Sequence, residues 1–394
     1  MKFAVLSFYE AYPPESGAAA VTYNTALHLP GQTTLIQLGD TERRVELSSH
    51  LTLVTIASES KHRFKKALAL RNKFKKISDV IKDIEPDVLV LEGASWAPYY
   101  VLQLGRLNRL GRTPRIIYHA HNVEYRLRRE RKDRLIAGLT RWAEKKLIRD
   151  ADLATAVSES DALEFNRLYG VRPALLPNGV DISAFDSVGD EEVERIRKKY
   201  SLKGFTVLFM GLITYPPTRD GLQFLMKGVF PSLAEARPDM KLVVIGGDVR
   251  EERRWLNNPG LIPFEEVPAL IKACDVCVAP IFSGSGTRVK ILEYLAARKP
   301  VISTAKGAEG LDAEAGRHLV LAEKADDFKH SILKLADNRD LAARLGGEGR
   351  ELVEMRYSWP RIFEQFIQKI ERIMLPDISK EAGPVRECPQ DKAQ

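Results

Sequence analysis

Residues 282–296 read FSGSGTRVKILEYLA, and this stretch carries the strongest fold and ligand signals of the chain. It follows an apolar run that ends at Pro280 and precedes another at 300–303, so a loop and a helix link two expected strands. Small residues form the loop, and Arg288 and Lys290 fall in the first turn of the helix. Because a helix start offers free backbone N–H groups, this stretch with its two cations suits a diphosphate.

A carboxylate follows on the same expected helix. Glu293 lies five residues after Arg288, with Leu292 and Leu295 beside it, and could accept two hydrogen bonds from a ribose diol. The alternative is an ordinary capped helix with Glu293 on its wet face. After the strand at 300–303, a second loop with glycines around a carboxylate contributes Glu309, Gly310 and Leu311. Two successive strand ends therefore present ligand-type loops.

The same alternation of apolar runs and helical patterns extends over most of the chain. It predicts strands at 3–8, 34–38, 51–56, 87–91, 115–119, 153–157 and 174–176, and then at 206–210, 241–245, 276–279, 300–303 and 318–321. Amphipathic segments of helical length, such as 21–29, 64–84 and 98–110, stand between them. Such alternation is typical of parallel sheets wrapped by helices, here two doubly wound α/β domains.

The predicted domains are 1–185 and 186–355, with a charged, weakly apolar break at 186–204. Residues 356–376 form a long amphipathic helix after the second sheet, and the polar residues 377–394 are expected to be a disordered tail.

The first domain has candidate ligand loops of its own. The first strand is followed by small residues around Gly17 that lead into a helix. Such a loop could bind phosphate at the helix start, and it is equally compatible with an ordinary turn. The fifth strand ends at His119, and His121 follows in the next loop. Ligands of open α/β sheets bind at the carboxyl ends of strands, so these imidazoles fit a binding site, although solvent-facing loop histidines are equally expected. A metal site is a poor interpretation, because other candidate metal ligands at a recognisable spacing are missing.

Together these motifs resemble the retaining glycosyltransferases of family 4, also called glycosyl transferases group 1. The resemblance runs from about residue 3 to 366. It rests on the loop around Gly17, the HNVE stretch that begins at His121, PNGVD at 177–181, and residues 284–297 with the PVIST that follows. The family implies the GT-B architecture: two facing Rossmann-like domains, with the C-terminal helix crossing back onto the first.

The resemblance also implies roles for single residues. Glu293 matches the glutamate that holds the donor ribose, Gly17 the loop glycine near the diphosphate, and His121 the histidine that contacts the donor sugar. Ser285, however, stands where the family has a first glutamate, and residues 212–215 lack its usual Arg and Lys. Arg288 and Lys290, helped by Arg219, would then bring the phosphate charge, with Ser285, Gly286 and Thr287 lining the donor site.

The expected activity is transfer of a sugar from a nucleotide-diphosphate sugar to a glycan or lipid-linked acceptor, with retention and without metal or other cofactor. Charge on the departing diphosphate would be stabilised by the cations and the helix start. Glu309 and its neighbours would help to orient the sugar. A sugar-nucleotide 2-epimerase of the same architecture and a catalytically silent partner subunit are the alternatives.

The overall composition limits the partners. The 394 residues are 44% hydrophobic and 29% charged, which excludes a disordered or collagen-like chain. Residues 1–185 carry 28 basic and 21 acidic side chains, so they hold the whole net charge of +7. The excess gathers in two segments, from Lys61 to Lys76 and from Arg126 to Arg149. Their aromatic residues are few, Phe64, Phe74 and Trp142, which argues against stacking on nucleic-acid bases. The segments suggest either solvated faces or an anionic membrane surface.

Three cysteines and no apolar run of membrane-spanning length favour a cytoplasmic protein, peripheral on the membrane if the basic segments bind lipid. Cys274 and Cys277 have redox or half-zinc spacing, but they sit in an apolar run, and we interpret them as buried core residues.

Overall fold

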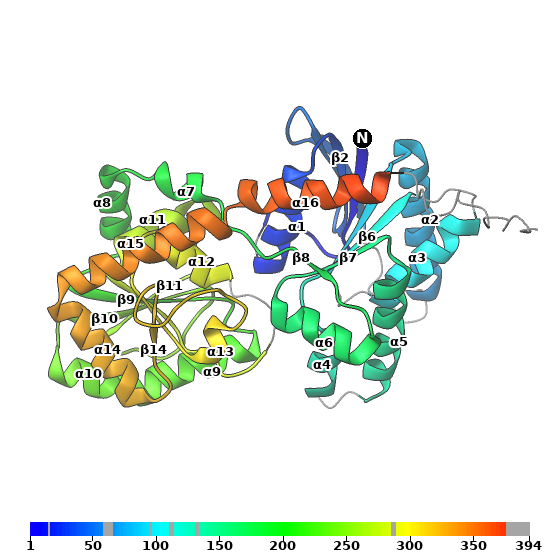
Figure 1. The fold of residues 1–394 in the computed structure, drawn as a ribbon. Helices are drawn as coiled ribbons and strands as arrows, with labels where there is room; N and C mark the ends of the chain where they lie inside the picture. Colours follow the sequence, from blue (N-terminus) through cyan, green and yellow to red (C-terminus); the bar gives the residue numbers. More distant parts are fainter. Residues whose placement is uncertain are drawn as a thin grey trace, which may run out of the picture.

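The computed structural model describes residues 1–14, 16–57, 66–93, 97–109, 114–130, 134–284 and 289–375. Over these ranges the chain forms two α/β domains, each around its own sheet (Figure 1). The predicted class, two doubly wound parallel-sheet domains, is confirmed. The tail predicted at 377–394 lies outside the described residues.

In the described part of the chain the first sheet has eight strands in the order β3-β4-β2-β1-β5-β6-β7-β8. Strand β3 pairs antiparallel with β4, and the other neighbours pair in parallel. The strands are β1 (Lys2–Leu6), β2 (Gln32–Gly39), β3 (Arg43–Glu46), β4 (Leu51–Ala57), β5 (Val88–Glu92), β6 (Arg115–Ala120), β7 (Leu153–Ala156) and β8 (Ala174–Leu175). The helices are α1 (Gly17–His28), α2 (Lys66–Ile84), α3 (Ala97–Arg109), α4 (Glu124–Glu130), α5 (Arg134–Asp150) and α6 (Glu159–Tyr169).

The second sheet is parallel, with the order β11-β10-β9-β12-β13-β14. Its strands are β9 (Phe205–Met210), β10 (Met240–Ile245), β11 (Leu256–Gly260), β12 (Val276–Ala279), β13 (Val301–Ser303) and β14 (Val320–Leu321). Its helices are α7 (Ile182–Asp186), α8 (Asp190–Lys199), α9 (Pro216–Phe224), α10 (Phe230–Ala236), α11 (Val267–Ala273), α12 (Val289–Ala296), α13 (Ala305–Ala308), α14 (Ala325–Asp337) and α15 (Arg339–Arg356). A π-helical turn, Leu225–Val229, joins α9 to α10, and a 3-10 turn, Phe264–Glu266, precedes α11. Cys274 and Cys277 are buried and unbridged, as expected.

Two strands were not expected from the sequence. β3 reads RRVE and β11 reads LNNPG, so neither has an apolar run. Both lie at the edge of their sheet, where only one side of the strand is hydrogen-bonded and where polar residues or proline are tolerated. The amide of Asn258 in β11 donates to the carbonyls of Val244 and Gly247, at 2.8 and 3.0 Å. Side-chain bonds thus help to hold an edge strand that hydrophobic patterning could not reveal.

The strand order reverses once in each sheet. β1 lies between β2 and β5, and β9 lies between β10 and β12, so the chain turns to the other side of the sheet at these strands. In doubly wound sheets, ligands bind beyond the carboxyl ends of the strands at such switch points. The ends of β1 and β5, and of β9 and β12, are therefore the places to look for a site.

The last helix, α16 (Trp359–Met374), runs from the second domain onto the first (Figure 1). Its apolar face packs into the core that contains Phe3 and Val5 of β1, which confirms the predicted crossing. The chain crosses between the domains at two places that are bonded to each other, since the N–H of Val180 donates to the carbonyl of Tyr357 at 2.8 Å. A Cβ on Gly179 would lie 2.6 Å from the ring of Trp359, so the PNGVD motif serves this crossing.

A buried carboxyl couples the helices that follow β6. Glu144 of α5 is fully buried, and it accepts hydrogen bonds from the N–H of Glu124 at 2.9 Å and the hydroxyl of Tyr169 at 2.6 Å. Burial outweighs these bonds and raises the pKa of Glu144 from 4.5 to about 7. The folded state therefore favours the protonated carboxyl.

This shift predicts a loss of stability as the pH rises. The unfolded chain releases the proton of Glu144 near its ordinary pKa, while the folded chain keeps it to about pH 7. The free energy of unfolding should fall by about 3 kcal/mol across that window through this group. Urea unfolding from pH 4.5 to 8 should show a shallower decline in Glu144→Gln than in the wild type. The exposed Glu191→Gln should leave the slope unchanged; equal slopes for all three proteins would contradict the prediction.

Candidate functional site

The switch point of the second sheet contains a lysine from α12. The ammonium of Lys290 donates to the carbonyl of Met210, the last residue of β9, at 2.5 Å. The backbone of Gly211 passes so close that a Cβ there would lie 2.5 Å from Nζ, and the φ of Gly211 is +147°, a conformation open to glycine. Lys290 therefore places its charge at the carboxyl end of β9, beside the residues at 212–215 that lack the family's cations.

Glu293 lies one turn beyond Lys290 on the same face of α12. Its side chain is partly buried, and its carboxyl has no hydrogen-bond partner among the residues that the structure describes. Burial raises the pKa of Glu293 to about 7, and the charge of Lys290 opposes the shift. A shielded carboxyl without a structural partner is a candidate ligand-binding group.

The predicted loop before α12 falls only partly within the described residues. Ser285, Gly286, Thr287 and Arg288 lie outside the described residues, so their roles stay predictions. Arg219 is exposed in the first turn of α9, the helix that follows β9. It shares the carboxyl edge with Lys290, and no structural partner holds it within the described ranges.

In the first domain, Gly17 is the first residue of α1, whose N-cap Ser16 accepts from the N–H of Ala19. A Cβ built on Gly17 would lie 3.9 Å from a methyl group of Val289, the first residue of α12. The starts of α1 and α12 therefore meet across the domain boundary. This places the predicted glycine loop beside the helix that carries Lys290 and Glu293.

The predicted histidines lie at the switch point of the first sheet, around a carboxylate that the sequence analysis missed. Glu92 is the last residue of β5 and is fully buried. Its Oε2 lies 2.6 Å from Nε2 of His121 and 3.2 Å from Nδ1 of His119. Burial alone would raise the pKa of Glu92, but the two histidines lower it to about 2. Burial also lowers the pKa of His121, against the influence of Glu92.

Two hydroxyls extend this cluster toward β1 and α1. Thr22 Oγ1 lies 3.4 Å from Oε2 of Glu92 and 2.6 Å from the hydroxyl of Tyr9. Burial, and then the charge of Glu92, raise the pKa of Tyr9 far above its ordinary value. The charged carboxylate thus sits among neutral donors, and His121, with 11% of its side chain exposed, is its most open histidine.

The second glycine loop also faces the other domain. Glu309 follows α13, pairs with Lys306, and is followed by Gly310, whose φ is +84°, and then by Leu311. Burial raises the pKa of Asp161 at the start of α6, and the charge of Glu309 raises it further. Glu309 therefore lies near the first domain, where the sequence analysis expected it to help to orient a ligand.

Apolar side chains at the same edge of the second sheet were not predicted either. Each follows a strand of that sheet, and each is between 43% and 76% exposed: Leu212, Leu261, Phe264 and Phe282. Exposed aromatic and aliphatic groups beside a charged site offer a surface for a flat ring. No polar signature marks them in the sequence.

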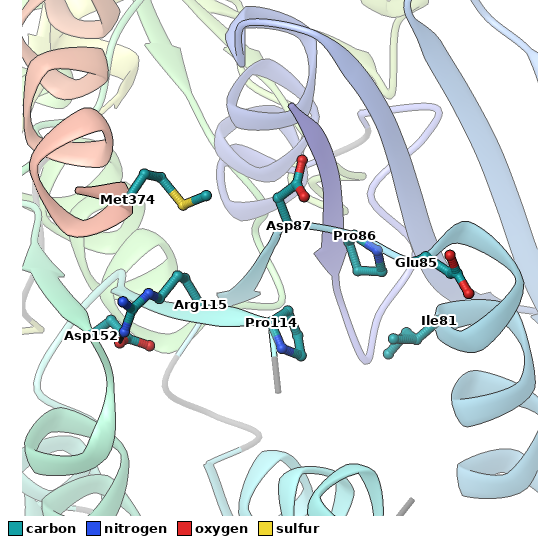
Figure 2. A pocket seen from close by; sticks show the side chains of 8 residues that line it. All are labelled: Ile81, Glu85, Pro86, Asp87, Pro114, Arg115, Asp152 and Met374. Carbon is teal, nitrogen blue, oxygen red and sulfur yellow. Dashed lines mark hydrogen bonds and ion pairs between the residues drawn. The ribbon is translucent and has the colours of Figure 1, made fainter. Parts of the chain in front are cut away.

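A hollow on the first domain lies at the opposite edge of its sheet (Figure 2). Its lining includes Asp87, Arg115 and Asp152, which come just before or at the starts of β5, β6 and β7. Asp87 accepts from the N–H of Lys2 at 2.8 Å, and Arg115 pairs with Asp152 at 2.8 Å. These charges hold strand ends together, so the hollow is not the candidate site.

The chain thus has two Rossmann-like domains whose switch points face each other. One switch point has a lysine and a carboxyl, and the other has a buried carboxylate and histidines. This arrangement defines the GT-B class. Family models divide the chain accordingly: Glycosyltransferase Family 4 matches residues 16–184, and Glycosyl transferases group 1 matches residues 204–338. Together they span most of the chain, which belongs to this glycosyltransferase family.

Several curated proteins are similar over part of their length. A GDP-mannose-dependent monoacylated alpha-(1-6)-phosphatidylinositol monomannoside mannosyltransferase of Corynebacterium glutamicum is 26% identical over 56% of this chain and 62% of its own. A phosphatidyl-myo-inositol mannosyltransferase of Mycobacterium leprae is 27% identical over 50% of this chain and 53% of its own. The matched part of this chain therefore spans less than two thirds of either relative.

Solved structures match over nearly the whole chain. Sucrose-phosphate synthase from Thermosynechococcus elongatus has a TM-score of 0.75 at 16% identity, covering 95% of this chain and 99% of that one. HepE of Anabaena, solved with UDP and glucose, has a TM-score of 0.74 at 15% identity, covering 94% of this chain and 100% of that one. At this identity the similarity establishes the GT-B fold.

Proposed function

We propose that this protein transfers a sugar from a nucleotide-diphosphate sugar to a saccharide or lipid-linked acceptor, with retention of the anomeric configuration. The observation that carries the proposal is the pair Lys290 and Glu293, one turn apart on α12 at the switch point of the second sheet. The first residue of that helix, Val289, lies next to Gly17 of the first domain. A cation for a diphosphate, and a carboxyl for a ribose that no described side chain binds, match the two polar parts of a nucleoside diphosphate.

The remaining groups fit the same ligand. Leu212, Leu261, Phe264 and Phe282 offer the nucleobase an apolar surface, and His121 would contact the sugar from the first domain. Lys290 and Arg288, with Arg219 at the same edge, would neutralise the leaving diphosphate, so we expect transfer without a metal ion. The mannosyltransferase names of the relatives and the UDP bound to HepE support a nucleotide-sugar donor and a lipid-linked acceptor.

The test is direct. Thermal shifts with UDP, GDP, ADP and CMP identify the nucleoside, because a ligand that binds the folded state raises its stability. The corresponding nucleotide sugar is then incubated with saccharide and lipid-linked acceptors, with and without EDTA, and the product's anomeric configuration is read by NMR. Epimerised donor without a glycosylated product would indicate the 2-epimerase alternative. Binding of no nucleotide would indicate a silent partner subunit.

The raised pKa of Glu293 predicts a pH-dependent donor affinity. A carboxylate accepts both hydrogen bonds of a ribose diol, whereas a protonated carboxyl gives up one acceptor site. Donor affinity should therefore fall as the pH drops below about 7, by at most about tenfold per pH unit, until it levels off at the affinity of the protonated form. Calorimetry with a nucleotide sugar measures this cleanly, because its diester phosphates stay ionised throughout. Glu293→Gln should bind more weakly at pH 8 and show a flat profile; a wild-type profile in that variant would exclude Glu293 from the site.

We further propose that the first domain associates with an anionic membrane surface. Helix α5 places apolar side chains on its exposed face, between 46% and 90% exposed: Leu135, Ile136, Leu139 and Trp142. Arg141, Lys145 and Lys146 are exposed beside them. Leu147, near the end of the same helix, is buried. No helix among the described residues is long and apolar enough to cross a bilayer, so the proposed mode is surface binding.

Vesicle co-sedimentation tests this surface. Binding should require anionic lipid and weaken with salt, since each surface Lys or Arg contributes about 1 kcal/mol within about one Debye length. Trp142→Ser together with Leu135→Ser should reduce binding at least as strongly as Lys145→Gln with Lys146→Gln. Met355→Ser, which changes an apolar residue 64% exposed on α15 of the second domain, is the matched control. Absence of binding to anionic vesicles at low salt would leave an enzyme for water-soluble acceptors.

A further inference from the structure

The cluster at the end of β5 has a feature that the proposed activity does not use. Glu92 is fully buried at the carboxyl end of a central strand, and both of its histidine partners come from the next strand and its loop. A buried carboxylate is costly unless hydrogen-bond donors surround it. Here the donors available to Oε2 are Nδ1 of His119, Nε2 of His121 and the hydroxyl of Thr22.

We propose that Glu92 is a positioning residue that fixes the tautomer and the ring orientation of His121. The inference rests on the proposed glycosyl transfer, in which His121 contacts the donor sugar. Because a carboxylate only accepts, the 2.6 Å contact requires Nε2 of His121 to carry the proton. Nδ1 of the neutral ring then keeps its lone pair, and the described residues form no hydrogen bond with it. His121 would therefore accept a hydrogen bond from a sugar hydroxyl rather than donate one.

The surroundings of Glu92 also determine which ring nitrogen of His119 carries the proton. His119 is fully buried, and its Nε2 has no hydrogen-bond partner within the described part of the chain. A proton there would be a buried orphan donor, so the proton belongs on Nδ1, 3.2 Å from both carboxylate oxygens. Both imidazoles thus donate to one carboxylate. The low pKa of Glu92 and the lowered pKa of His121 agree with a charged carboxylate between neutral rings.

The same three side chains could also be considered as metal ligands, since their ligand atoms lie within 4.8 Å of one another. The 2.6 Å separation between Oε2 of Glu92 and Nε2 of His121 argues against this. Two ligands that are each about 2.0–2.1 Å from a tetrahedral zinc ion are more than about 3 Å apart. The observed distance is that of a charge-assisted hydrogen bond.

The first experiment reads the tautomer in the unmodified protein. Two-bond 1H–15N correlation spectra of 15N-histidine-labelled protein near pH 7 distinguish protonated from unprotonated ring nitrogens. The signals of the two rings are assigned by their loss in His121→Asn and in His119→Asn. We expect Nε2–H for His121 and Nδ1–H for His119. Nδ1–H on His121, or a doubly protonated ring, would overturn the proposal without reference to any activity.

The second experiment removes the charge. Glu92→Gln replaces one carboxylate oxygen with an NH2 donor, which requires an unprotonated nitrogen on the ring that it meets, so at least one ring should change tautomer. The kcat of sugar transfer should fall by about 10–100-fold, as when a group that orients a reactive side chain is removed. Calorimetric affinity for the nucleoside diphosphate should stay at the wild-type value, because that half of the donor would bind the second domain. Glu92→Asp, which keeps the charge with a shorter reach, should recover part of the kcat.

The outcomes are separable. Unchanged kcat and unchanged tautomers in Glu92→Gln would overturn the positioning role. Expected tautomers in a protein that transfers no sugar would contradict the proposed function and leave the hydrogen-bond assignment standing. One equivalent of zinc bound by wild type and lost in Glu92→Gln, measured by elemental analysis after dialysis against zinc, would identify a metal centre and overturn the proposal. If Glu92→Gln does not fold, the spectra of the wild-type protein still decide.

Discussion

Lys290→Met should lower the affinity for nucleoside diphosphates by about 10–100-fold, the effect of losing a charge-assisted hydrogen bond of about 1.5–3 kcal/mol. The ammonium of Lys290 donates a hydrogen bond to the carbonyl of Met210 at the switch point. Methionine at position 290 would keep the length and most of the apolar volume of the lysine side chain. Affinity for the free nucleoside should change little, because that ligand has no charge for Lys290 to bind. Calorimetry with both ligands measures the difference.

The matched control is Lys241→Met. Lys241 also donates from Nζ to a backbone carbonyl, that of Arg254, at 2.8 Å, but it lies near the start of β10, at the opposite edge of the sheet. Its replacement should leave both affinities intact. Equal losses for nucleoside and nucleoside diphosphate in Lys290→Met would mean that this lysine only supports the backbone around Gly211.

Phe366→Ala should destabilise the protein by about 3–5 kcal/mol, the usual cost of removing a buried aromatic side chain and leaving its cavity. Phe366 is 1% exposed and lies in the core that α16 shares with β1 and α1. Its ring also packs edge-on against Phe363 at a centroid separation of 5.6 Å. Because this core belongs to the first sheet, the loss should appear in the unfolding of the first domain.

Urea unfolding followed by tryptophan fluorescence and far-UV circular dichroism tests this expectation, with separate fits if the two probes disagree. Met355→Ala is the control, since Met355 precedes α16 by a few residues but is 64% exposed. A change below about 1 kcal/mol in Phe366→Ala, the range of surface substitutions, would show that α16 is not anchored by this core.

Local patterns in the sequence were enough for the class of fold. The apolar runs at 206–210 and 276–279 became β9 and β12, and the apolar spacing within 356–376 predicted the helix α16, which spans Trp359–Met374. These features depend on the period of side chains along a strand or a helix, which neighbouring residues fix. The edge strands β3 and β11 were missed because partial solvent exposure leaves no such period.

The residues of the candidate site also differ in whether local sequence patterns could reveal them. Lys290 and Glu293 could be singled out because they share one helix turn, and Gly17 because it stands in a loop after a strand. Glu92 could not be found, since it closes an apolar strand and lies 29 residues before His121. That β5 lies between β1 and β6 is what brings Glu92, Thr22 and His121 together. Likewise, the hydrogen bond from Lys290 to Met210, 80 residues away in the sequence, forms because α12 packs beside β9.

The sequence by itself therefore determined the elements, their class and the residues with suitable chemistry, because hydrophobic periodicity and loop composition are local properties. Tertiary structure alone decided which of those residues share a site and which face of α5 is exposed. Strand order and helix packing set these distances, and they arise from the burial of the whole apolar surface rather than from any one segment.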